Sequence, residues 1–346
     1  MNTRQVISVV GCHAEGEIGD VIVGGVLPPQ GATLFEQMQT MQRDHDDVRR
    51  VLLCEPRGSV ARHANLLVPP LAPGCQLGAI IMEPTEYVPS SGSNLICIAT
   101  VALETGLVPM REPETTVMIE VPGGVVTARA TCRDGKCVSV EIENVASFVD
   151  RLDAPLEIEG LGTLSVDVAY GGMFYALVDA TRLGFRVTAD EARDLAVLGE
   201  RIRLAAREQF NVVHPLNPDI ADVSIVQLHE PFRGVGEVTR NTCIVAPGRS
   251  DRSPTGTGTC ARMAVLRARG QMQVGDTMVH SSLIDSRFRG RILGDCRVGD
   301  RPAILPAISG RGWITGFHRY VVDADDPWPC GYVLNDTWGV TGGVTQ

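Results

Sequence analysis

The sequence has no long apolar run and no excess of basic residues. No segment approaches the roughly 18 consecutive apolar residues of a membrane-spanning helix, and His13, Glu15 and Glu17 interrupt the N-terminal apolar run before it could act as a secretory signal. We therefore expect a cytoplasmic protein without a membrane partner. The 31 Lys and Arg are outnumbered by 41 Asp and Glu, which gives a formal net charge of -10. Because no basic stripe is available to neutralise phosphates, we expect no nucleic-acid partner.

The chain also lacks the spacing of a metal or cofactor site. Its 10 cysteines include no C-x-x-C pair, so most are expected to be buried small hydrophobic residues. The HAEGE segment at 13–17 matches no metal-ligand pattern. GVG at 234–236 is only a fragment of a dinucleotide fingerprint, and TGTGTC at 255–260 lacks the lysine of a P-loop. We expect neither a metal nor a cofactor.

Two segments repeat the same pattern of residues. The first, SSGSN from Ser90, continues as LICIATVALET to Gly106, and the second, PTGTG from Pro254, continues as TCARMAVLRAR to Gly270. Ser91 and Thr255 are 164 positions apart, as are Gly106 and Gly270. Each segment predicts a hydroxyl and glycine turn that opens a helix, with a closing glycine in the left-handed conformation. The constant spacing indicates internal duplication.

The remaining pattern predicts two similar α/β domains. Amphipathic helices begin after Thr33, with Glu36 three residues on, and after Thr188, with Glu191; both pairs predict capping boxes. Strand-like stretches surround the helices, and a chain of 346 residues exceeds one usual core. We expect an α/β (α+β) fold in which each domain is a curved, mostly antiparallel sheet around a central helix. The first domain is placed at 1–146, completed by 317–346, and the second at 147–316.

The paired turns indicate one active site. A helix N-terminus presents backbone N–H groups and the positive end of the helix dipole, which suits a carboxylate. Duplicated domains would bring both N-termini to a cleft, with Ser91 and Thr255 facing one another across a small bound molecule. Such an arrangement suits chemistry at the carbon next to a carboxylate, with the backbone N–H groups of Gly92, Ser93, Gly256 and Thr257 holding the carboxylate.

The same motifs resemble those of a known family. YVPSSGSNLICIAT at 87–100 resembles the YxPMCGHNTICVAT stretch of proline racemases and hydroxyproline epimerases, and DRSPTGTGTCA at 251–261 resembles their DRSPCGTGTSA. EPRG at 55–58, AYGGMFYALVDA at 169–180 and GRGWITGFHRYVVDADDPWPCG at 310–331 are similar to family stretches in the same order. The resemblance implies the two-domain fold of diaminopimelate epimerase and a proline or hydroxyproline substrate. It also implies that Asp251 receives the ring ammonium; the alternative is that Asp251 stabilises the turn before Ser253.

The departures from the family pattern bear on the reaction. The two catalytic cysteines of racemases are replaced by Ser91 and Thr255, and an alcohol titrates far above a thiol, whose pKa is near 8.5. A symmetric two-thiol proton exchange is therefore not available. Threonine at the second position resembles trans-3-hydroxy-L-proline dehydratases, in which only one group must take the C2 proton. A serine base needs an activating neighbour, for which His63 and Glu55 are the candidates.

Two other functions stay open. The chain could be a 4-hydroxyproline 2-epimerase or a proline racemase, or it could be an imino-acid binding protein that has lost catalysis with both thiols. In each reading the partner is a small molecule. The sequence does not decide whether the chain forms a homodimer.

Overall fold

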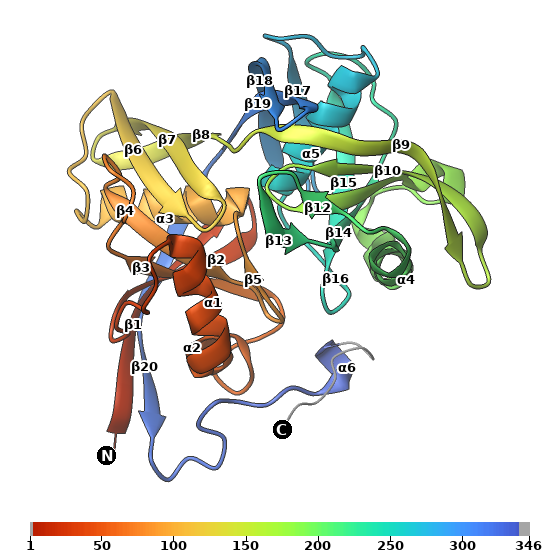
Figure 1. Cartoon of the computed structure of the whole chain (residues 1–346). Coiled ribbons are helices and arrows are strands. Elements are labelled where there is room, and N and C mark those ends of the chain that lie inside the picture. The colour runs from red at the N-terminus through yellow and green to blue at the C-terminus, as the bar shows by residue number, and fades with distance from the viewer. Residues whose placement is uncertain (1–2, 339–346) are drawn as a thin grey trace. The chain divides into compact units, whose positions relative to one another are not determined.

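The computed structural model describes residues 3–338, which divide into two compact units (Figure 1). Unit 1 comprises the residues up to Glu141 and those from Arg311 onward, and unit 2 is Ile142–Gly310. Strand β8 (Lys136–Glu143) carries the chain from unit 1 into unit 2. Within 3–338, no helix is both long and apolar enough to cross a membrane.

Unit 1 is a sheet wrapped around one buried helix. Its strands pair in the order β20, β1, β2, β3, β4, β6, β7, with β5 beside β4; the β2–β3 and β4–β6 pairs are parallel and the others antiparallel. Helix α3 (Gly92–Glu104) packs against β1, β2, β3, β7 and β20, and every residue from Gly92 to Leu103 is buried. The strand bounds are β1 (Thr3–Ala14), β2 (Glu17–Gly24), β3 (Arg62–Val68), β4 (Leu77–Met82), β5 (Tyr87–Val88), β6 (Glu114–Val121), β7 (Gly124–Arg133) and β20 (Gly312–Asp323).

A second core of unit 1 lies between the sheet and helices α1 (Leu34–Asp44) and α2 (Asp47–Leu53). Leu34, Met38 and Met41 recur at helical spacing and are buried there. One of the two bonds of the predicted capping box is present, because Thr33 Oγ1 accepts from Glu36 N at 3.1 Å. The Glu36 carboxylate returns a bond to Ala32 N at 2.7 Å, one residue earlier than the standard motif. A short helix, α6 (Asn335–Trp338), ends the described part of the unit.

Unit 2 is a closed sheet around a second buried helix. The ring runs β9, β10, β11, β14, β15, β17, β18, β19 and returns to β9; the β11–β14 and β15–β17 pairs are parallel. Helix α5 (Gly256–Ala268) packs against β9, β10, β11, β18 and β19. The strand bounds are β9 (Ser147–Ile158), β10 (Gly162–Tyr170), β11 (Phe174–Asp179), β12 (Val213–His214), β13 (Asn217–Ala221), β14 (Val223–His229), β15 (Val238–Val245), β16 (Arg249–Ser250), β17 (Thr277–Ser281), β18 (Arg287–Val298) and β19 (Arg301–Gly310).

Helix α4 (Ala192–Gln209) covers the ring of unit 2, packing on β9, β14, β15 and β16. The capping box predicted at its start is wrong. Residues Ala189–Glu191 form a separate 3₁₀ turn, and the Thr188 side chain makes no cap bond. The Glu191 carboxylate instead accepts from Arg186 N at 2.6 Å, which removes it from the reciprocal bond that a capping box needs.

The two units repeat one topology. In each, a first parallel pair (β2–β3 or β11–β14) is joined through outer helices, and a second (β4–β6 or β15–β17) is joined through the central helix. Helices α3 and α5 have 13 residues each, and both closing glycines are left-handed, with φ 76° at Gly106 and 72° at Gly270. The predicted fold class is confirmed.

Candidate active site

Ser91 and Thr255 occupy the N-cap positions of the two central helices. The first helical hydrogen bonds are Leu95 N–H to Ser91 O and Thr259 N–H to Thr255 O, each 2.9 Å long. The three amides between cap and first bond therefore have no acceptor inside their helix, and the positive end of the helix dipole lies behind them. Each helix start can bind an anion such as a carboxylate. These amides belong to Gly92, Ser93 and Asn94 in α3 and to Gly256, Thr257 and Gly258 in α5.

Neither hydroxyl is used to cap its helix. Ser91 Oγ accepts a hydrogen bond from Asn94 Nδ2 at 2.9 Å, whereas Thr255 Oγ1 donates to Asp251 Oδ2 at 2.6 Å. Both residues are buried, with 7% and 6% of their surface exposed. Ordinary helix capping therefore does not account for the two hydroxyl residues, which are held by other side chains.

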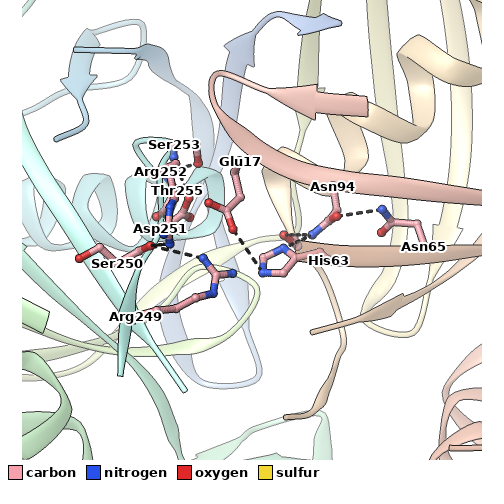
Figure 2. A network of polar contacts seen from close by, with 11 residues as sticks. Glu17, His63, Asn65, Asn94, Arg249, Ser250, Asp251, Arg252, Ser253 and Thr255 are labelled. Carbon is pink, nitrogen blue, oxygen red and sulfur yellow. Dashed lines mark hydrogen bonds and ion pairs between the residues drawn. The ribbon is translucent and has the colours of Figure 1, made fainter. Parts of the chain in front are cut away.

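Two buried amides of unit 1, Asn65 and Asn94 (Figure 2), orient Ser91. Asn65 Nδ2 donates to the backbone oxygen of Asp20 at 3.1 Å and to Asn94 Oδ1 at 2.8 Å. Because a carbonyl oxygen only accepts, the Asn65 amide has one orientation, and Asn94 must turn its oxygen towards Asn65. The Asn94 nitrogen therefore faces Ser91 Oγ and also His63 Nδ1, which is 3.0 Å away.

His63 connects these amides to a carboxylate. Since Asn94 donates to Nδ1, the neutral His63 ring carries its hydrogen on Nε2, and Nε2 lies 3.5 Å from Glu17 Oε1. His63 and Glu17 are 3% and 1% exposed. The sequence singled out His63 as a helper of Ser91, and the structure links the two residues through Asn94. Glu55, the other residue that the sequence offered as a helper of Ser91, is bonded to Tyr332 through two backbone hydrogen bonds of 3.1 and 2.7 Å.

Asp251 organises the start of α5 in unit 2 (Figure 2). Its Oδ1 accepts from Ser253 N at 2.8 Å while its Oδ2 accepts from the Thr255 hydroxyl, and Thr255 N donates to Ser253 Oγ at 3.1 Å. These hydrogen bonds agree with the alternative interpretation of Asp251, in which its carboxylate stabilises the turn before Ser253. Thr255 itself has φ 62° and ψ 110°, a strained backbone for a β-branched residue, which costs about 1–3 kcal/mol and is typical of functional sites.

The first turn of α5 is fixed by two further hydroxyls. Thr257 Oγ1 lies 2.6 Å from Tyr175 OH. Thr259 Oγ1 donates to Thr255 O at 2.9 Å and so accepts from His280 Nδ1 at 2.8 Å. Burial lowers the pKa of His280 to about 3, which keeps the ring neutral. No local motif in the sequence points to His280, because strand β17 comes beside the first turn of α5 only when the chain folds.

The cysteines near the central helices are not thiolates. Burial raises the pKa of Cys243 and of Cys260 to about 12, and that of Cys97 well above its usual value. They are buried small residues, as the sequence predicted. In residues 3–338, no group of three or more His, Cys, Asp or Glu is arranged to hold a metal ion.

A helix that begins at a hydroxyl N-cap and is wrapped by a sheet occurs twice in the chain, which defines a class of duplicated two-domain α/β proteins. A phenazine biosynthesis protein of the PhzF family from Bacillus anthracis shares this fold, with a TM-score of 0.55 at 13% identity, over 91% of this chain and 98% of that one. Residues 9–333 match the family model described as proline racemase, and the chain belongs to the proline racemase family.

Two solved structures of that family resemble the chain over almost their whole length. A hydroxyproline epimerase from Agrobacterium vitis, solved with bound trans-4-hydroxy-L-proline, is 39% identical, with a TM-score of 0.96 over 100% of both chains. A probable proline racemase from Agrobacterium radiobacter, solved with bound carbonate, is 39% identical, with a TM-score of 0.93 over 96% of this chain and 98% of that one.

Proposed function

We propose that the chain dehydrates trans-3-hydroxy-L-proline to 1-pyrroline-2-carboxylate without a cofactor. The observation that carries this proposal is the bonding of the two N-cap hydroxyls. Thr255 commits its only hydroxyl hydrogen to Asp251, so it can accept a hydrogen bond but cannot hand a proton to C2. Epimerisation needs a proton donor on the second face of the substrate, and dehydration does not.

Ser91 is the proposed proton acceptor. Its deprotonated oxygen takes the C2 proton, the C2–H electron pair forms the C2=C3 double bond, and the C3–O bond breaks. The leaving hydroxide takes back the proton from the Ser91 hydroxyl and departs as water, which restores the deprotonated oxygen. The resulting enamine tautomerises to the cyclic imine. The Asn94 N–H that points at Ser91 Oγ favours negative charge on that oxygen, because a hydrogen bond to the charged form lowers the pKa of a group. The Glu17–His63 pair behind Asn94 holds the donor in place.

The helix-start amides are proposed to bind the substrate carboxylate. Gly92 and Ser93 in α3, with Gly256 and Thr257 in α5, precede the first helical hydrogen bond of their helix and offer N–H groups to an anion. Asp251 is proposed to receive the ring ammonium while it holds Thr255, since a buried carboxylate is the natural partner of that charge.

The test is a product assay. Purified full-length protein with trans-3-hydroxy-L-proline should give a pyrroline that o-aminobenzaldehyde traps as a coloured adduct. A protein that only binds imino acids would give saturable binding without the adduct, and that result would refute the proposal.

A second candidate is hydroxyproline 2-epimerase. Its support is the 39% identity to the Agrobacterium vitis epimerase across the whole of both chains. This activity requires a group that exchanges a proton at each face of C2. Alcohols are far weaker acids than thiols, and Thr255 would first have to release its bond to Asp251.

A further inference from the structure

A polar cavity of about 280 Å³ opens in unit 2 beside α5, away from the helix start. Arg262, on α5, lines it, seven positions after Thr255 and hence about 10 Å further along the helix axis. The cavity is therefore distinct from the proposed catalytic groups. Three arginines and three aspartates line the cavity, namely Arg182, Arg262, Arg269, Asp153, Asp167 and Asp179.

Two of the three arginines already have carboxylate partners. Arg269 Nη2 donates to Asp153 at 2.9 Å and to Asp167 at 2.6 Å. Arg182 Nε lies 3.7 Å from Asp179. The aspartates are thus largely engaged within the cavity wall.

Arg262 differs from both. It is 6% exposed, it has no hydrogen bond or ion pair with any residue in the described range, and its Nε is wholly buried without an acceptor. Burial lowers the pKa of Arg262 to about 10, so the guanidinium remains protonated at neutral pH. A buried cation with unsatisfied donors is costly unless an anion accepts from it.

The size and charge of the cavity restrict that anion. A volume of about 280 Å³ lies just below the usual range of small-molecule pockets, which starts at roughly 300 Å³, so the ligand must be small. The neighbouring aspartates oppose a doubly charged anion such as phosphate. A planar carboxylate, in contrast, can accept two parallel N–H bonds from a guanidinium.

We propose that this cavity is a second ligand site, in which Arg262 binds the carboxylate of a small monocarboxylic molecule. Arg182 lines the same cavity and its side chain is 74% accessible, so its charge can attract the anion from solvent.

The experiment observes the Arg262 Nε–H directly by NMR. The full-length protein is labelled with ¹⁵N-arginine. The Nε–H resonance of Arg262 is assigned as the one that is present in the wild-type spectrum and absent from that of Arg262→Lys. Titration with sodium acetate should shift this resonance saturably, whereas sodium chloride at equal ionic strength should not. Inorganic phosphate and zwitterionic glycine are titrated for comparison. Acetate should bind more tightly than phosphate, because the aspartates of the cavity oppose a doubly charged anion. An Arg262 resonance that acetate leaves in place, or that chloride moves equally, would overturn the proposal.

A second variant keeps the test independent of how Arg262→Lys folds. Arg182→Met changes an exposed side chain and should weaken acetate binding about twofold to fivefold, as expected for a partly exposed charge. Arg207→Met, an exposed arginine on α4, is the matched control and should leave the acetate affinity unchanged. Equal affinities in Arg182→Met and the control would contradict the role assigned to Arg182.

Discussion

Asn94 Nδ2 donates to Ser91 Oγ over 2.9 Å, and Asn94 lies two positions after Gly92, whose backbone amide is the first free one of α3. Ser91 is thus placed beside both backbone and side-chain N–H groups. A serine needs an activating neighbour to act as a base, and the Asn94 amide is that neighbour for Ser91 in the proposed mechanism.

Removing the Asn94 donor should slow turnover. Asn94→Ala leaves Ser91 and all backbone amides in place but removes the N–H that favours charge on Oγ, so kcat should fall about 100-fold, as for other lost donors to a developing charge. KM should change little, because the carboxylate-binding amides remain. Steady-state kinetics on the preferred substrate measure both constants.

A matched control is Thr105, the C-cap residue of the same helix. Thr105→Val removes a hydroxyl that bonds Val101 O at 2.6 Å at the far end of α3. It should keep kcat. A loss of kcat in Thr105→Val equal to that in Asn94→Ala would mean that α3 is merely sensitive to change.

Ser91→Ala should abolish turnover and retain substrate binding. The helix-start amides that hold a carboxylate are backbone groups, which the substitution does not remove. Isothermal titration calorimetry gives the affinity, and the adduct assay gives the rate. Turnover at the wild-type rate would remove Ser91 from the mechanism.

Thr255 stores backbone strain that glycine can release. Thr255→Gly and Thr255→Ala both lose the bond to Asp251, but only glycine adopts φ 62° freely. The glycine variant should therefore be the more stable of the two by about 1 kcal/mol. Urea unfolding curves measure the difference, and an alanine variant as stable as the glycine variant would show that the Thr255 backbone is not strained.

The buried His280 should make stability depend on pH. The unfolded ring takes up a proton near pH 6.5, whereas the pKa of about 3 in the folded protein keeps the buried ring neutral. The unfolded state therefore binds more protons between these values, and the contribution of His280 is complete above pH 6.5 and lost as the pH falls towards 3.

His280→Asn preserves a donor to Thr259 and cannot titrate. The stability of the wild type relative to this variant should fall by up to about 1.4 kcal/mol per pH unit within that window. Denaturant unfolding at several pH values gives this difference. A difference independent of pH would contradict the assignment of a neutral His280.

The repeated helix starts could be predicted from the sequence because their signal is local. Gly92 and Gly256 follow hydroxyl residues, and the same number of residues leads to Gly106 and Gly270. The burial of helix α3 was equally visible, since its apolar run LICIATVAL has no polar face.

The network around Ser91 could not be predicted because its members meet only after folding. His63 lies on β3 and Glu17 on β2, and the parallel pairing of these strands brings both towards the start of α3. The capping box predicted at Thr188 and Glu191 was wrong for the opposite reason. Its local sequence pattern is suitable, but in the folded chain the Glu191 carboxylate accepts a hydrogen bond from Arg186 N instead. That Ser91 and Thr255 face each other stays a prediction.

The most direct test of the proposed chemistry follows C2 of the substrate by NMR in heavy water. Purified protein is incubated with trans-3-hydroxy-L-proline and, in parallel, with trans-4-hydroxy-L-proline. Dehydration by Ser91 predicts loss of the 3-hydroxy substrate to the pyrroline, and a 4-hydroxy substrate that keeps its L configuration. Deuterium at C2 together with inversion of 4-hydroxy-L-proline, and no pyrroline from the 3-hydroxy isomer, would contradict it.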